Sequence, residues 1–179
     1  MIPFAKRLTV LETDRLRLHP LTEADAADIF PLMGDTEVMA FLDLPETDEP
    51  DLVAELVRAQ VSAMGQGKAV YWTIRAIADD AFVGCCELAD IDRWHKRAEV
   101  GFMLGRGTWG QGYGLEAMRA VVGYAAASGL RRLTATIHLG NRRSETILDK
   151  LGFREEGLLR GHVLRDGDRR DCQLFGLLL

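Results

Sequence analysis

The spacing of hydrophobic positions in the first part of the chain predicts a strand, two helices and then a run of strands. Residues 15–19 alternate polar and apolar side chains, as a half-buried strand does. A helix is expected from Thr22 towards Met33, and a second, amphipathic helix over residues 51–64. The period then shortens to two, which predicts successive strands over 70–78, 82–89 and 98–104, with a tight turn at Asp79 and Asp80 between the first two.

The second part of the chain returns to helical spacing and ends in a hairpin. Its strongest helix covers residues 115–128, where apolar residues recur every three or four positions and Gly129 supplies the stop. A strand follows over 132–139, and Asn141 caps a further helix that ends at Gly152. The strands 158–165 and 170–178 flank a turn at 166–168 and form a hairpin. This order of elements predicts an α/β fold of the mixed α+β kind.

Composition narrows the classes of protein to consider. A length of 179 residues fits one domain, 1–179, with an ordinary globular balance of 47% hydrophobic and 27% charged residues. A net charge of −5 argues against nucleic-acid binding, which usually needs a basic surface. No apolar run is long enough to span a membrane, and residues 1–10 lack the apolar stretch of a signal peptide. The three cysteines, Cys85, Cys86 and Cys172, form no disulfide pattern, which favours a cytoplasmic location.

A glycine-rich loop carries the clearest chemical signal. Five glycines fall within residues 105–114, between a predicted strand and the start of a predicted helix. Glycines let the backbone approach a ligand closely and turn several N–H groups towards one point. The N-terminus of the following helix adds a partial positive charge. The loop therefore predicts a phosphate-binding site.

The same loop also matches the fingerprint of dinucleotide-binding proteins. Gly105, Gly107 and Gly110 have the G-x-G-x-x-G spacing. That fingerprint also requires a carboxylate at the end of the next strand, for the ribose hydroxyl, and residues 139–143 contain none. The arginines in that segment suit a phosphorylated ribose instead, so an NADP-binding oxidoreductase stays as a remote alternative. A P-loop is excluded because no Gly-Lys-Ser/Thr follows the glycines.

Read in the register of residues 109–114, the loop resembles another family. Residues 98–160 are similar to the acetyl-CoA-binding core of the GNAT superfamily of N-acetyltransferases, whose Gln/Arg-x-x-Gly-x-Gly/Ala loop holds the pyrophosphate. Further segments resemble its RimJ/RimL-like branch: Leu11–Pro20, Ala98–Phe102, Trp109–Ala117, Asn141–Ser144 and Lys150–Phe153. The resemblance implies a GNAT-like acyl-CoA N-acyltransferase fold, with a mostly antiparallel sheet and a central, splayed parallel pair flanked by helices. Two positions depart from the family pattern: Trp109 stands first in the loop, and Leu148 occupies the place where many members have a Tyr as general acid.

The resemblance also implies which residues contact acetyl-CoA. Phe102, Met103 and Leu104 would pair their backbone with the pantetheine amides. The N–H groups that would face the pyrophosphate belong to Gln111, Gly112, Gly114 and Leu115. Asn141 would bind the pantetheine arm as well as cap its helix, and Ser144 would lie near the thioester sulfur and protonate the leaving thiolate.

Acidic residues on the strands are candidates for the general base. Glu99 is unusual in a central strand and shares a face with Gly101 and Met103. In a cleft its carboxylate would accept a proton from the incoming amine, whereas a structural role would pair it with a cation such as Arg97. Glu87 is a second candidate for the base.

Other reactive side chains show no catalytic pattern. The four histidines have no metal-ligand spacing, so no metal is expected. Cys85 and Cys86 lack the paired histidine of a nucleophile and are interpreted as core residues. Glu116 is expected to complement the dipole of its helix.

These features together predict an acetyl-CoA-dependent N-acetyltransferase in which a primary amine attacks the thioester directly. Backbone N–H groups of the strand before the loop would meet the developing oxyanion. The predicted acceptor is a protein or peptide N-terminal α-amine. A CoA-binding protein without catalysis, and an acetyltransferase of small-molecule amines, remain as alternatives. Either a monomer or a homodimer is compatible with the sequence.

Overall fold

A computed structural model describes residues 9–179. Most of residues 1–10, where no signal peptide is expected, therefore lies outside the described residues. The strands form one sheet in the order β1-β2-β3-β4-β5-β6-β8-β7. Their bounds are Leu11–Glu12, Leu16–Pro20, Val70–Ala76, Phe82–Asp92, Arg97–Leu104, Arg132–His138, Arg154–Arg165 and Asp168–Leu178 for β1 to β8. All neighbouring strands are antiparallel except β5 and β6.

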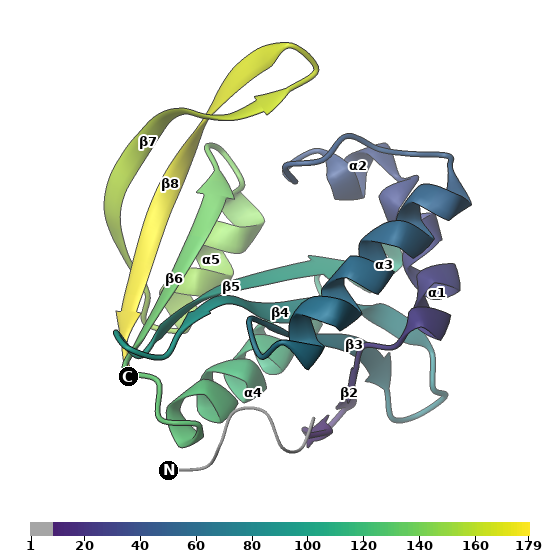
Figure 1. Cartoon of the computed structure of the whole chain (residues 1–179), viewed down its shortest axis with the longest axis horizontal. Coiled ribbons are helices and arrows are strands. Elements are labelled where there is room, and N and C mark those ends of the chain that lie inside the picture. The colour runs from purple at the N-terminus through teal and green to yellow at the C-terminus, as the bar shows by residue number, and fades with distance from the viewer. Residues whose placement is uncertain (1–8) are drawn as a thin grey trace.

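The parallel pair at the centre of the sheet is splayed. Pairing between β5 and β6 runs from Arg97 opposite Arg132 to Glu99 opposite Thr134 and goes no further. Beyond that point β5 stays paired with β4 up to Leu104, while β6 follows β8. The two strands therefore diverge, as Figure 1 shows. The predicted fold class, a mostly antiparallel sheet with a splayed parallel pair, is confirmed.

Helices cover both faces of the sheet. The bounds are Glu23–Asp25 for η1, Ala26–Met33 for α1, Thr36–Met39 for α2, Pro50–Gly65 for α3, Arg106–Thr108 for η2, Tyr113–Ala127 for α4 and Arg142–Lys150 for α5. In Figure 1, α1 and α3 lie together on one side of the molecule, away from α4 and α5. Within residues 9–179, no helix is both long and apolar enough to cross a lipid bilayer.

Two hydrophobic clusters hold these layers together. The larger one packs α4 and α5 on the sheet and includes the fully buried Trp72, Leu88 and Met118. The smaller one joins α1 and α3 around Val53 and Val57, against the other face. Strand β5 contributes to both, because its side chains alternate between the two faces. One face of β5 is therefore turned towards each cluster.

The predicted elements are present, but several begin or end elsewhere. The helix expected from Thr22 starts as the 3₁₀ turn η1, where Thr22 and Asp25 cap each other's backbone, and α1 follows from Ala26. Helix α4 begins two residues earlier than expected, at Tyr113. Strand β7 begins at Arg154 rather than 158, because register shifts at 155/157 and 159/163 interrupt its alternation. The short α2 and β1 were not predicted.

Candidate active site

A cavity of about 510 Å³ opens where β5 leaves β6. It lies between the end of β5, the glycine loop and the first turn of α5. Most residues predicted to contact the cofactor line it: Phe102, Met103, Leu104, Gly112, Gly114, Leu115, Asn141 and Ser144. Gln111 is not among the lining residues; its side chain donates a hydrogen bond of 2.9 Å to the Gly107 carbonyl instead. The structure thus brings together nearly all of the residues named from the resemblance.

The glycine loop is shaped by backbone conformation that favours glycine. Gly112 is the N-cap of α4 and has a φ of +81°, in the left-handed region. The N–H groups of the next residues have no partner within the helix, and the helix dipole makes this end positive. Gly114 allows close packing of α4, because a Cβ there would lie 2.9 Å from Ile147 Cδ1. The loop can therefore present N–H donors to an anion.

Arg15, far away in sequence, holds the loop in place. Its Nη1 donates to the Gln111 carbonyl at 3.0 Å, and its Nη2 pairs with Glu116 at 2.6 Å. The guanidinium also lies 4.7 Å from the centre of the Tyr113 ring. Glu116, expected only to complement the helix dipole, thus also anchors the turn between β1 and β2 that carries Arg15.

A second aromatic–cation contact borders the cavity at Trp109, the loop residue that departs from the family pattern. The Trp109 indole donates to the Leu104 carbonyl at 3.0 Å and so ties the loop to the end of β5. Arg143 stacks over the Trp109 ring at 3.9 Å, and Arg142 and Lys150 line the same cavity. This basic edge suits a ligand with several phosphates. The pair of Trp109 and Arg143 was missed because the two residues meet only in the folded chain.

Asn141 and Ser144 lie at the start of α5. The Asn141 Oδ1 accepts a hydrogen bond of 3.3 Å from the Ser144 N–H, which confirms the predicted helix cap. Both residues also line the cavity, so the Ser144 hydroxyl lies within reach of a ligand there. The two interpretations of Asn141, cap and ligand contact, are geometrically compatible.

Glu99 lies where β5 and β6 begin to diverge. Its Oε1 accepts a hydrogen bond of 3.1 Å from the Thr136 N–H, across the gap between β5 and β6. Arg97, the expected structural partner, pairs with Asp92 at 3.4 Å. Glu99 therefore bridges the diverging strands, just beyond their last backbone pair.

Glu87 lies next to Glu99 and has an unusual environment. It sits opposite Gly101 in the β4–β5 pair, and a Cβ on Gly101 would be 2.6 Å from the Glu87 Oε1. Glycine at this position gives the carboxyl room to lie across β5. Burial, followed by the charges of Glu99, Asp90 and Asp43, raises the pKa of Glu87 from 4.5 to about 7. A carboxyl with a pKa near neutrality is suited to general-base catalysis.

The same face holds a histidine that sequence analysis did not select. His138 Nε2 lies 2.8 Å from Asp43 Oδ1, and His138 is only 5% exposed. Asp43 lies in the segment after α2, so the contact joins that segment to β6. In residues 9–179, no group of three or more His, Cys, Asp or Glu side chains is arranged to hold a metal ion.

Comparison with known proteins places these features in a family. The family "Acetyltransferase (GNAT) domain" matches residues 15–154. The chain belongs to the GNAT acetyltransferases. Its recognition from the sequence as a GNAT N-acetyltransferase is thereby confirmed.

Several relatives of this GNAT chain have been named. It is 27% identical over 170 residues to the "Uncharacterized N-acetyltransferase YoaA" of Bacillus subtilis, covering 94% of this chain and 96% of that protein. It is 29% identical over 173 residues to the "[Ribosomal protein uS5]-alanine N-acetyltransferase" of Escherichia coli, covering 93% and 89%. The structure of RimL, described as a ribosomal L7/L12 alpha-N-protein acetyltransferase in complex with coenzyme A, superposes with a TM-score of 0.87 at 19% identity, covering 96% of this chain and 98% of RimL.

Two further observations bear on how this GNAT enzyme performs catalysis. Leu148, at the position of the Tyr acid in many members, is 1% exposed and packs in the larger core cluster, so it takes no part in the cavity. Burial raises the pKa of the Cys85 thiol to about 12, and burial also raises the pKa of Cys86. Thiols with such pKa values are poor nucleophiles. Cys85 and Cys86 are therefore poorly suited to covalent catalysis.

Proposed function

We propose that the protein transfers an acetyl group from acetyl-CoA to the N-terminal α-amine of a protein or peptide. One observation carries this proposal: the cavity at the splay is bordered by the N-terminus of α4 and by the basic residues Arg142, Arg143 and Lys150. Glu87 and Glu99 do not line this cavity and lie on the adjoining strands β4 and β5. Acetyl-CoA supplies the activated acetyl group. The proposal takes residues 1–179 as one catalytic domain, working in the cytoplasm because its three cysteines are free thiols.

In this proposal the loop and the end of β5 hold acetyl-CoA. The N–H groups of Gly112, Gly114 and Leu115 face the pyrophosphate, together with that of Gln111, whose carbonyl Arg15 fixes. The backbone of Phe102, Met103 and Leu104 pairs with the pantetheine arm, since β6 has left that edge free. Asn141 contacts the same arm. The thioester then lies at the splay, near Ser144.

The proton path in this proposal crosses β5. Glu87 accepts the proton from the amine, because its carboxyl has room above Gly101 and a pKa near 7. Glu99, the base first expected from the sequence, bridges β5 and β6 where they diverge and adds the charge that keeps the pKa of Glu87 high. Ser144 donates a proton to the departing thiolate of CoA.

The preference for α-amines follows from proton energetics. At pH 7 an α-amine costs about 1.4 kcal/mol to deprotonate, whereas a lysine side chain costs about 4.6 kcal/mol. A site with a single carboxyl base and no Tyr acid favours the amine that is easier to deprotonate. The Escherichia coli relative is named for acetylating an alanine of ribosomal protein uS5, and RimL is described as a ribosomal L7/L12 alpha-N-protein acetyltransferase. Both descriptions support the same class of acceptor.

Mass spectrometry of products separates the candidate functions. The protein and acetyl-CoA are incubated with peptides that have a free N-terminus, with N-blocked peptides that contain lysine, and with small amines. We expect acetylation chiefly of the free N-termini. Preference for lysine or small amines would refute the acceptor assignment, and binding of acetyl-CoA without any product would favour a CoA-binding protein. Thermal stabilisation by NADP but not by acetyl-CoA would favour the oxidoreductase.

A matched pair of glycine variants tests the cofactor site. Gly112 and Gly129 lie at the two ends of α4 and both have positive φ, +81° and +89°. Alanine at either position costs about 1–2 kcal/mol of stability through backbone strain. We expect only Gly112→Ala to weaken acetyl-CoA binding in calorimetry, because only Gly112 lines the cavity. Equal affinities for the two variants would refute the loop assignment.

A further inference from the structure

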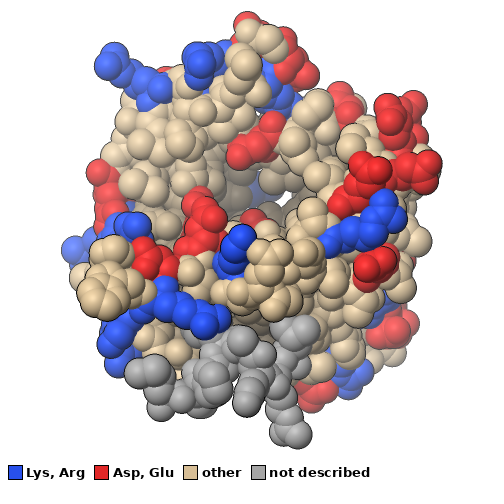
Figure 2. Space-filling model, viewed as in Figure 1, with Lys and Arg blue, Asp and Glu red and all other residues tan. Residues whose placement is uncertain are grey.

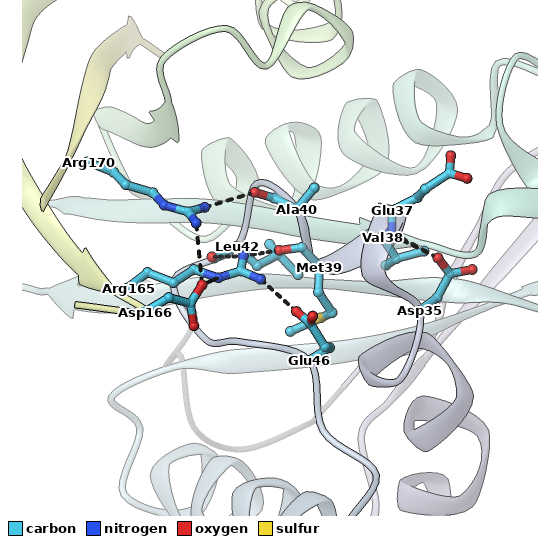
Figure 3. A network of polar contacts seen from close by, with 10 residues as sticks. All are labelled: Asp35, Glu37, Val38, Met39, Ala40, Leu42, Glu46, Arg165, Asp166 and Arg170. Atoms are coloured by element: carbon cyan, nitrogen blue, oxygen red, sulfur yellow. Dashed lines mark hydrogen bonds and ion pairs between the residues drawn. The ribbon is translucent and has the colours of Figure 1, made fainter. Parts of the chain in front are cut away.

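Two arginines of the β7–β8 hairpin hold the end of α2 and the residues that follow it (Figure 3). Arg165 donates through Nη1 to the carbonyls of Met39 and Leu42, the latter at 3.0 Å, and through Nη2 to the Glu46 carboxylate at 2.9 Å. Arg170 donates to the Ala40 carbonyl at 3.3 Å. The hairpin and this segment, residues 38–46, are more than one hundred residues apart in sequence, so these bonds close a large loop in the fold.

Arg165 is a buried side chain that joins two segments, not a charge on the surface. Its side chain is only 4% exposed, although Glu46 is 45% exposed. A guanidinium presents five N–H donors in a planar fork, so one side chain can serve two carbonyls and a carboxylate together. The Arg165 Nε also lies 3.3 Å from Asp166, which in turn lies 3.4 Å from Arg170. The cluster therefore fixes the geometry of both arginines.

The segment that Arg165 fixes forms a wall of the active site. Val38, Phe41 and Leu42 line the cavity. Asp43 contacts His138 at 2.8 Å and is one of the charges that raise the pKa of Glu87. Helix α2 has only four residues, so local backbone structure does little to position this wall. Met39 and Leu42 pack in the smaller hydrophobic cluster, and side-chain contacts from the hairpin and from β6 fix the rest of the wall.

We propose that Arg165 is a positioning residue that determines acceptor selectivity, an inference that rests on the proposed function. In this inference, Arg165 holds residues 38–46 against the hairpin and so narrows the way into the cavity that Val38, Phe41 and Leu42 line. The amine then reaches the thioester through a bordered passage. Figure 2 shows the surface hollowed between the hairpin side and the helical side, with carboxylates on its border. Such a passage admits a slim chain end and excludes an amine with a bulky neighbouring side chain.

The test compares two acceptors in four proteins. The acceptors are peptides that differ only in their first residue, alanine or tryptophan, and the readout is the ratio of kcat/KM for the two. The proteins are wild type, Arg165→Met, Arg165→Lys and a control, Arg169→Met. Arg169 lies on the same hairpin, but among residues 9–179 its side chain bonds only within the hairpin, to the Gly161 carbonyl at 2.9 Å. Hydrogen exchange of the amides in residues 40–47 reports independently on the wall, and circular dichroism checks folding.

We expect Arg165→Met to reduce the alanine preference by about tenfold, since hydrogen bonds to charged groups are the strong ones and several are lost together. Exchange in residues 40–47 should rise in that variant and not in Arg169→Met. Arg165→Lys should recover only part of the preference, because an ammonium cannot bridge the same three acceptors. Glu46→Gln, which leaves the two carbonyl bonds intact, gives a milder variant with the same expected direction.

The outcomes separate this inference from the proposed function. If wild type acetylates peptide N-termini but the ratio stays within twofold of wild type in Arg165→Met, the selectivity role is refuted while the proposed function stands. Unchanged exchange in residues 40–47 would equally refute the holding role. If wild type acetylates no α-amine at all, the proposed function itself fails, and the selectivity role fails with it.

Discussion

Replacing Glu87 by glutamine should make the protein more stable at alkaline pH while abolishing most activity. The difference between a pKa of 4.5 in the unfolded chain and about 7 in the fold corresponds to about 3 kcal/mol. Because the folded state binds the proton more tightly, stability falls as the pH rises from about 4.5 to about 7 and is level above that. Glutamine carries no charge to desolvate, so Glu87→Gln removes this pH-dependent loss.

The size of the effect therefore depends on pH in a defined way. We expect Glu87→Gln to be more stable than wild type by about 3 kcal/mol at pH 8, and by less than about 1 kcal/mol at pH 5, where most of the cost has not yet developed. Urea unfolding at the two pH values measures both differences. The control is Glu55→Gln, on α3, whose side chain is 70% exposed. That variant should change stability little at either pH.

The same variant tests the role of Glu87 in catalysis. Wild-type kcat/KM should rise with pH as the Glu87 carboxyl loses its proton near pH 7. Glu87→Gln should lower kcat/KM by about 10²–10⁴-fold, the usual range for a general base. Glu99→Gln removes a negative charge that raises the pKa of Glu87. The rise of kcat/KM with pH should therefore occur at lower pH in this variant. Unchanged stability of Glu87→Gln at pH 8 would refute the burial argument, and full activity would refute the base assignment.

Three further predictions concern the cofactor site and the thiols. Gly114→Val should lower acetyl-CoA affinity in calorimetry with the fold retained, because its side chain must displace Ile147 at the cavity wall; wild-type affinity would contradict the site. Asn141→Ala should cost about 1 kcal/mol in thermal unfolding through the lost cap and should also raise the KM for acetyl-CoA; an unchanged KM would leave it a cap alone. Replacing Cys85 and Cys86 together by alanine should retain turnover, and mass spectrometry of the quenched wild-type enzyme should find no acetylated cysteine.

The parts of the site that the sequence predicts are those encoded over short distances. The loop of residues 105–114 is recognisable because its glycines, the preceding strand and the following helix are contiguous. The Asn141 cap is likewise a local signal, three residues from the N–H that it binds. The splay between β5 and β6 was predicted only from family resemblance, because no periodicity in the sequence indicates where two strands stop pairing.

The parts that the sequence does not predict depend on contacts between distant segments. His138 and Asp43 are 95 positions apart, and Arg165 is more than one hundred positions from the carbonyls that it binds. The role of Glu87 depends on its pairing with Gly101, and that register is known only from the folded sheet. A lone histidine or arginine in a sequence carries no information on which segment will lie above it.

The arrangement around β5 explains how one strand can serve two substrates. Its even-numbered residues, such as Phe102 and Leu104, face α4 and the glycine loop, where Gly114 allows close approach. Its odd-numbered residues, Glu99 and Gly101, lie on the side of Glu87, which is the base in the proposed function. A continuous sheet would keep these two sides apart. Backbone pairing between β5 and β6 ends at Thr134. In the proposed function, a thioester held from one side of the sheet meets an amine from the other side beyond this point.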